Sequence, residues 1–175
     1  MNYADLRPID VANGPGIRVS LFVSGCTHHC KECFNPETWD FAFGDPFTDA
    51  ETEAILKHLE PAHIKGLSVL GGEPFEPENQ ETVLNLIRRV REMYPHKDVW
   101  CYSGYLFEAL RDGQVGNHSR ALLEQLDVLV DGPFVIERKD LSLRFRGSSN
   151  QRLIDLNQTR NKGTLTLLPD RDRHH

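Results

Sequence analysis

Three cysteines lie within eight residues of one another, with Cys26, Cys30 and Cys33 forming the pattern C-x3-C-x2-C. Thiolates spaced this closely can converge on one metal centre. A structural zinc site needs four ligands, and a cubane iron–sulfur cluster normally uses four thiolates. A cluster held by three thiolates keeps one iron open, and an open iron can bind a substrate or cofactor. The absence of a fourth neighbouring cysteine is therefore informative.

A second segment whose residues could bind a ligand is Gly71-Gly72-Glu73-Pro74. Because Gly71 and Gly72 have no side chains, backbone can approach a ligand closely there. Their carbonyls, or the carboxylate of Glu73, can accept hydrogen bonds from an ammonium group. Taken alone, the segment is also compatible with a simple turn closed by Pro74. Together with the cysteines, it favours an iron–sulfur cluster with an open iron over a Cys3His zinc site or unliganded thiols.

Periodicity predicts strands that alternate with helices. Apolar or β-branched runs predict strands. Helices are predicted by a capping box at Thr48 and Glu51, by a cap at Asn79 and by apolar residues at helical spacing. The expected strands are 17–23, 67–70, 98–102 and 127–131, with further strands at 152–156 and 164–168. The expected helices follow Thr48 as far as Leu59, begin at Asn79, and cover 106–111 and 120–126. This alternation predicts an α/β fold with a mostly parallel sheet.

Four chemically suggestive segments each follow a predicted strand. They are the cysteine loop, the segment 71–74, Ser103-Gly104 and the turn that begins at Asp131. Right-handed crossovers place every such strand-to-helix loop at one edge of a parallel sheet. Ser103 and Gly104 would offer a hydroxyl and open backbone to a ribose or carboxylate. Asp131 would bond a ribose hydroxyl or cap a turn.

Length and charge narrow the function classes. The chain has 175 residues, which predicts one domain over 1–170 with a disordered tail at 171–175. The formal net charge is −6, whereas nucleic-acid-binding proteins typically carry positive surface charge. No apolar run approaches a membrane span, and the first residues lack the pattern of a signal peptide. The sequence therefore predicts a cytoplasmic protein that binds neither nucleic acid nor a membrane.

Three further side chains have less distinctive interpretations. His28 and His29, inside the cysteine loop, are most simply explained as solvent-exposed. Cys101 lies in the middle of a predicted strand beside Trp100, which predicts a buried structural thiol.

The sequence resembles the radical S-adenosylmethionine superfamily and, within it, the activating proteins of anaerobic (class III) ribonucleoside-triphosphate reductases. The cysteine triplet and Gly-Gly-Glu-Pro are superfamily features, and the other motifs point to the activating proteins. The resemblance covers most of the chain and includes Asn13 to Arg18, Cys26 to Cys33, Asn35, Trp39, 71–74, 102–105, 131–134 and 146–152. It implies an open partial (β/α) barrel.

The resemblance also implies a mechanism. Cys26, Cys30 and Cys33 would ligate three irons of a [4Fe-4S] cluster, and S-adenosylmethionine would chelate the fourth. An electron from the reduced cluster would break the sulfonium C–S bond. The resulting 5'-deoxyadenosyl radical would abstract hydrogen from a glycine of the reductase. The cofactor contacts would come from the glycine-rich turns and nearby side chains, namely Gly71, Gly72, Glu73, Ser103, Gly104, Asp131 and Phe34.

One position departs from the superfamily pattern, and the choice of partner leaves alternatives. Many members carry an aromatic residue just before the third cysteine, where this chain has Glu32, and the aromatic here is Phe34. The implied partners are the large subunit of the reductase and a flavodoxin- or ferredoxin-type electron donor. The alternatives are an activating enzyme of another glycyl-radical enzyme, such as pyruvate formate-lyase, and a non-enzymatic zinc or iron–sulfur module.

Overall fold

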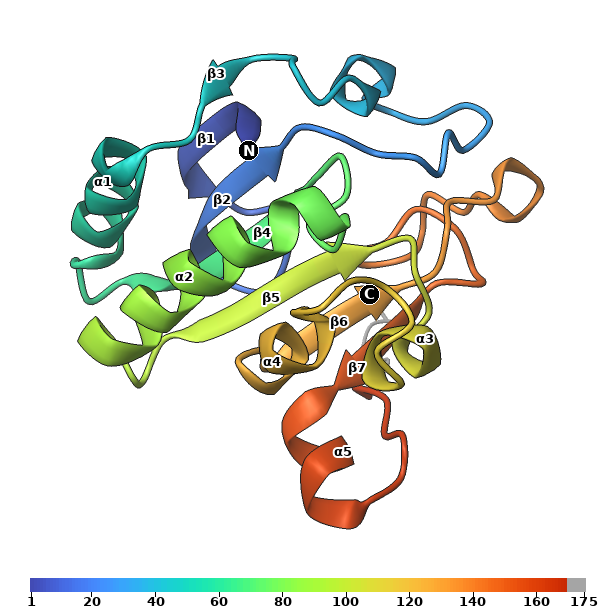
Figure 1. Cartoon of the computed structure of the whole chain (residues 1–175). Coiled ribbons are helices and arrows are strands. Elements are labelled where there is room, and N and C mark those ends of the chain that lie inside the picture. Colours follow the sequence, from blue (N-terminus) through green and yellow to red (C-terminus); the bar gives the residue numbers. More distant parts are fainter. Residues whose placement is uncertain (170–175) are drawn as a thin grey trace.

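The computed structural model describes residues 1–169, so the tail expected at 171–175 lies outside the described residues. Seven strands form one sheet in the order β3-β1-β2-β4-β5-β6-β7 (Figure 1). Neighbouring strands from β2 to β6 pair in parallel, whereas β1, β3 and β7 pair antiparallel. The strands are β1 Asn2–Asp10, β2 Ile17–Val23, β3 Asp45–Pro46, β4 Ile64–Gly71, β5 Asp98–Ser103, β6 Val128–Asp131 and β7 Arg152–Asp155.

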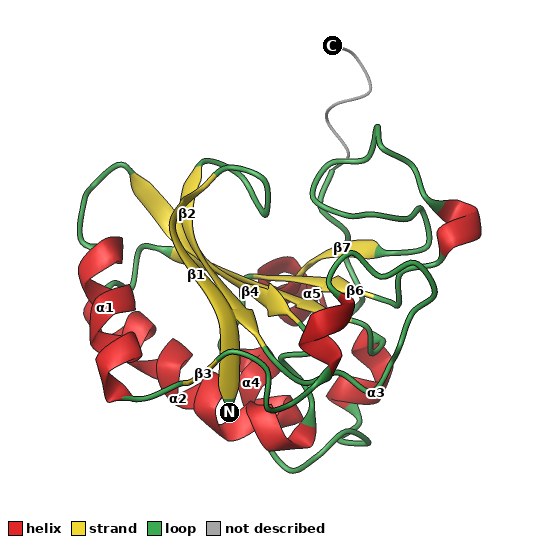
Figure 2. Cartoon of the chain, turned by 90° about the horizontal axis from the view of Figure 1, so that it is seen from above, coloured by secondary structure: helices red, strands yellow, loops and turns green. Residues whose placement is uncertain are grey.

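The helices connect the strands and cover one face of the sheet. Figure 2 shows α1 to α4 together on one side, which is the arrangement that right-handed crossovers between parallel strands produce. The helices are α1 Asp49–Leu59, α2 Pro77–Met93, α3 Phe107–Arg111, α4 Ser119–Glu124 and α5 Leu156–Lys162, with short 3-10 helices η1 Pro36–Trp39 and η2 Ile136–Arg138. Because β3 and β7 are edge strands, the sheet is open, as the partial-barrel prediction requires.

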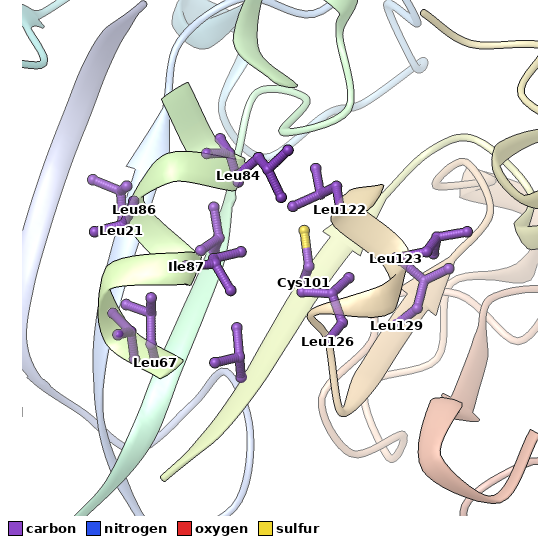
Figure 3. Close-up of a cluster of buried hydrophobic side chains, with 14 of the residues drawn as sticks. Leu21, Leu67, Leu84, Leu86, Ile87, Cys101, Leu122, Leu123, Leu126 and Leu129 are labelled. Carbon is purple, nitrogen blue, oxygen red and sulfur yellow. The ribbon is translucent and has the colours of Figure 1, made fainter. Parts of the chain in front are cut away.

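The main core lies between these helices and the sheet. Figure 3 shows the Cys101 sulfur among leucine and isoleucine side chains of α2 and α4. The Cys101 side chain is fully buried, and burial raises the pKa of its thiol well above the ordinary value. The predicted burial of Cys101 is confirmed.

Most of the predicted elements are present, with two corrections. The capping box of α1 forms as the sequence indicates, because Thr48 N donates to the Glu51 carboxylate at 2.6 Å. Asn79 does not cap α2, which begins at Pro77, and its side-chain amide instead donates to the Ser24 and Glu73 carbonyls. The segment 164–168 forms one isolated bridge, at Leu167, and no strand.

Among the helices of residues 1–169, none has the length and apolar character of a membrane-spanning segment.

The carboxyl ends of β2, β4, β5 and β6 lie at one end of the molecule, where the loops after β2 and β6 approach each other in Figure 1. This end holds the candidate site.

Candidate cluster and cofactor site

A cavity of about 580 Å³ opens at the carboxyl ends of the parallel strands. This volume is typical of sites for small ligands and cofactors, which occupy roughly 300–1,000 Å³. The topology brings together segments that are far apart in the sequence, as predicted. Nine of the ten predicted site residues line the cavity, namely Cys26, Cys30, Cys33, Phe34, Gly71, Gly72, Glu73, Ser103 and Gly104.

All three cysteines of the loop line this common cavity. Two residues between the cysteines, His29 and Glu32, have positive φ values of 49° and 62°. Such left-handed conformations are uncommon for residues with side chains and cluster at functional sites. One such residue lies between each pair of successive cysteines, and Cys26, Cys30 and Cys33 all line the same cavity.

Backbone amides are directed at two of the sulfur atoms. The N–H groups of His28 and His29 act on Cys26, and that of Phe134 acts on Cys30. These amides stabilise negative charge on sulfur, but burial outweighs them, raising the pKa of Cys26 to about 11 and also raising the pKa of Cys30. Because metal ligation requires thiolates, cluster assembly on these thiols must release protons.

The cysteine loop is tied directly to the glycine-rich turn. Gly72 N donates to Val23 O at 2.7 Å, and Glu73 N donates to Gly25 O at 2.8 Å. A Cβ on Gly72 would lie only 2.7 Å from Gly25 O and 2.8 Å from Thr38 O. Glycine is therefore required at this position by the backbone of the cysteine loop, whatever ligand approaches from the cavity.

Glu73 is a buried hydrogen-bond acceptor that joins three segments. Its carboxylate is 1% exposed and accepts from His28 Nε2 at 2.7 Å, Gly104 N at 2.6 Å and Phe75 N at 2.9 Å. Ser103 Oγ donates to both carboxylate oxygens, at 3.1 and 3.0 Å. Glu73 thus holds the cysteine loop, its own turn and the turn after β5 in one arrangement.

His28 differs from the expectation of solvent exposure. The ring is half-buried, pairs with Glu73 and packs edge-on against Tyr105, with ring centroids 4.4 Å apart. Burial opposes the charge on His28, but the hydrogen bond and charge of Glu73, with Glu76, raise its pKa overall. His29 is exposed as expected and stacks on Trp39.

A second buried acid, Glu76, was not predicted from the sequence. Its Oε1 atom accepts from Thr27 N at 2.8 Å and from Thr27 Oγ1 at 2.7 Å, anchoring the loop just after Cys26. Cys26, His28 and Glu76 present ligand atoms within 4.8 Å of one another. The His28 Nε2 and Glu76 Oε1 atoms already have protein partners, so this group is a hydrogen-bonded support beneath the loop. The signal that could have revealed it is the second glutamate, three residues after Glu73.

Asp131 and Phe34 occupy opposite extremes of exposure. Asp131 is fully buried behind the cavity, where it accepts from Phe107 N at 2.8 Å and from Arg152 Nε at 2.9 Å. These bonds join Asp131 to the first residue of α3 and to β7, and not to the turn ahead of Gly132 that the sequence offered as the alternative to ribose binding. Phe34 is 63% exposed at the cavity mouth, where its ring lies 5.1 Å from that of Phe134.

Arg152→Ala is expected to lower the free energy of unfolding by about 3 kcal/mol, because it leaves the Asp131 carboxylate buried without its cation. Arg152 also pairs with Glu108. Asp131 first and Glu108 second raise the pKa of the Arg152 guanidinium, because each carboxylate accepts its hydrogen bonds. Urea denaturation measures the change. Adding Asp131→Asn to the same chain should restore part of the loss, and Arg111→Ala, which breaks an exposed pair, should change little. Equal small effects of Arg152→Ala and Arg111→Ala would contradict this reading.

Comparison with known proteins identifies the family. Residues 12–154 match the family described as 4Fe-4S single cluster domain. The activating protein of anaerobic ribonucleoside-triphosphate reductase from Vibrio cholerae is 46% identical over 153 residues, which cover 86% of this chain and 96% of that protein. This chain belongs to the family of anaerobic ribonucleoside-triphosphate reductase-activating proteins. The Escherichia coli K12 member is 44% identical over the same coverage, and that of phage T4 is 39% identical over 87% of this chain and 93% of its own length.

The residues of this activating-protein family member fit the cluster domain that the comparison assigns. Three cysteines line one cavity, and backbone amides point at two of the sulfurs. A Cβ on Gly71, whose φ is +110°, would lie 2.5 Å from Val23 N, so the neighbouring strand requires glycine at this position. Four cysteines are present in the sequence, and the fourth, Cys101, is buried in the core on the helical side of the sheet. This leaves three cysteines at the cavity, in the spacing that fits a cluster domain.

Proposed function

We propose that this chain generates a glycyl radical on an anaerobic ribonucleoside-triphosphate reductase, using a [4Fe-4S] cluster and S-adenosylmethionine. Activation of such a reductase by a 4Fe-4S radical enzyme is the function of the family. When bound, the reduced cluster and S-adenosylmethionine supply a 5'-deoxyadenosyl radical able to abstract hydrogen from a glycine. The observation that carries the proposal is the three-thiol cavity beside the glycine-rich turn.

Each group of residues has a distinct task in this proposal. Cys26, Cys30 and Cys33 would hold three irons, and the fourth iron would face S-adenosylmethionine. The backbone at Gly71, Gly72 and Gly104 would receive the polar end of that cofactor through its carbonyls, because the N–H groups of Gly72 and Gly104 already donate to Val23 O and to Glu73. The Glu73 carboxylate would act through the segments it joins, because its oxygens already accept protein hydrogen bonds. Phe34, at the mouth, would pack against the apolar part of the cofactor, and Ser103 would help orient the turn.

Exclusion of water is a further task of the protein. The floor of the cavity beyond the turns is formed by side chains of the central strands, including Phe22, Leu70 and Val130. These apolar side chains provide a dry wall for a reactive intermediate that would otherwise attack solvent or protein. An electron donor of the flavodoxin or ferredoxin type would reduce the cluster from outside.

Mixing experiments test the proposal. After anaerobic reconstitution with iron and sulfide, the chain should yield a glycyl radical, seen by electron paramagnetic resonance, on the anaerobic reductase in the presence of S-adenosylmethionine and a reductant. Pyruvate formate-lyase, the target of the alternative function, should give no such signal under the same conditions. A radical on pyruvate formate-lyase alone would overturn the choice of partner, and a radical on neither would overturn the function.

A further inference from the structure

Residues 146–152 anchor a segment that borders the site. Gln151 Oε1 accepts from Gly147 N at 2.9 Å and from Ser148 N at 3.1 Å, and its Nε2 donates to Gly132 O. Asn150 Nδ2 donates to Pro133 O at 2.8 Å, so the run is anchored to the turn that follows β6. We call residues 135–151 the rim segment, because several of them border the cavity mouth.

The rim segment is folded on itself. Val135 N donates to Ser148 Oγ, and Ser149 N donates to Arg138 O at 2.9 Å. Lys139 and Ser148 form an antiparallel bridge. These contacts hold the segment in one shape, so whatever binds there meets a preformed surface and orders little chain on binding.

The tip of the rim segment carries an apolar side chain that nothing in the described chain covers. Leu141 is 88% exposed, more than any other large apolar residue that the structure describes, and it borders the cavity that holds the three thiols. Phe34, 63% exposed, borders the same cavity, with Lys139 Nζ 5.5 Å from the centre of its ring. Leu141 and Phe34 thus both expose apolar surface at the border of one cavity, where a partner could cover it.

The charge of the rim segment is opposite to that of the whole chain. It contains four basic residues and two acidic ones, whereas the chain carries a formal net charge of −6. The basic residues are Arg138, Lys139, Arg144 and Arg146, and the acidic ones are Glu137 and Asp140. A locally basic rim on an acidic protein favours an acidic binding partner and disfavours a second copy of this chain.

We infer that the rim segment is the docking surface for the stretch of the reductase that carries the target glycine. The inference rests on the proposed function. Hydrogen abstraction requires reacting atoms about 3–3.5 Å apart, so the glycine must pass the cavity mouth to reach a radical formed inside. The entering stretch meets Leu141 with an apolar side chain and meets the basic rim with carboxylates. The partner is thus an extended, acidic segment with an apolar residue near its glycine.

Leu141→Asp tests this surface, with Met93→Asp as the matched control. Met93 is also an exposed apolar residue, at 53%, but it ends α2 and does not border the cavity. Both variants are reconstituted anaerobically and assayed twice. One assay measures 5'-deoxyadenosine formed from S-adenosylmethionine without reductase, and the other measures the glycyl radical as reductase concentration is varied.

Leu141→Asp should raise the reductase concentration needed for half-maximal radical yield by about tenfold, equivalent to about 1.4 kcal/mol of docking free energy. Its reductase-independent 5'-deoxyadenosine formation should match that of the Met93→Asp control. Added salt should raise the half-saturating concentration for the unmodified chain, because it screens the basic rim.

Three results would overturn the inference. An unchanged half-saturating concentration would show that the reductase docks elsewhere. A parallel loss of 5'-deoxyadenosine formation would place Leu141 in the cofactor site and not in a docking surface. Absence of 5'-deoxyadenosine formation by the unmodified chain would remove the proposed function itself, and with it the inference that depends on it.

Discussion

Cys30→Ala is expected to abolish iron loading and S-adenosylmethionine cleavage together. Cys30 is the middle ligand of the proposed set and lines the same cavity as Cys26 and Cys33. With only two thiolates, two irons of the cubane would lack a protein ligand. The cluster should therefore not survive purification. Iron should fall from about four atoms per chain to near zero, as measured by metal analysis after anaerobic reconstitution.

Cys101→Ala is the matched control for this prediction. It removes a thiol of the same type from the core side of the sheet, where the sulfur lies among apolar side chains (Figure 3). The truncation should lower stability modestly and leave iron content and cleavage in place. Retention of a full cluster in Cys30→Ala, or its loss in Cys101→Ala alone, would show that the ligand set has been assigned wrongly.

Glu73→Gln should lower the free energy of unfolding of the cluster-free chain by about 3 kcal/mol and greatly reduce cleavage activity. The carboxylate accepts hydrogen bonds from His28, Ser103, Gly104 and Phe75 and is almost completely buried. An amide has one acceptor oxygen, so its NH2 group must face at least one buried donor. A buried donor without an acceptor costs about 1–3 kcal/mol, and more where a charged group is involved.

Urea denaturation of the same chain measures this loss, with an unchanged m value as evidence that the unfolded state is not altered. Glu78→Gln, at an exposed position on α2, is the control and should be nearly neutral. A stability change in Glu73→Gln no larger than that of the control would mean that the carboxylate does not join the three segments as the geometry indicates.

The parallel part of the fold was predictable because its signals are local. The strands at 17–23 and 98–102 are β-branched or apolar runs, and the capping box at Thr48 directly marks the start of α1. The general rule that strand-to-helix loops share one edge then placed the cysteines beside Gly71 and Gly72. The antiparallel strand β1, which lies between β3 and β2, was missed, since Asn2–Asp10 carries three charged residues and a proline and shows no run of buried apolar residues.

The support of the site was less predictable because it depends on long-range contacts. In the sequence, His28 cannot be told from an ordinary loop histidine. Its burial comes from Glu73 and Tyr105, which lie in the turns that follow β4 and β5. Asp131 follows a strand as a ligand-binding residue would, yet Arg152 reaches it from an antiparallel strand that pairs beside it. Neither pairing leaves a trace in local sequence periodicity.

The central claim is that three thiolates hold a cluster with one open iron. Electron paramagnetic resonance of the reduced, reconstituted chain tests it most directly, with and without S-adenosylmethionine. Binding of the cofactor's amino and carboxylate groups to the open iron should change the cluster signal, whereas a compound that lacks both groups, such as 5'-deoxyadenosine, should not. A cluster signal identical in the presence and absence of saturating S-adenosylmethionine would contradict the account.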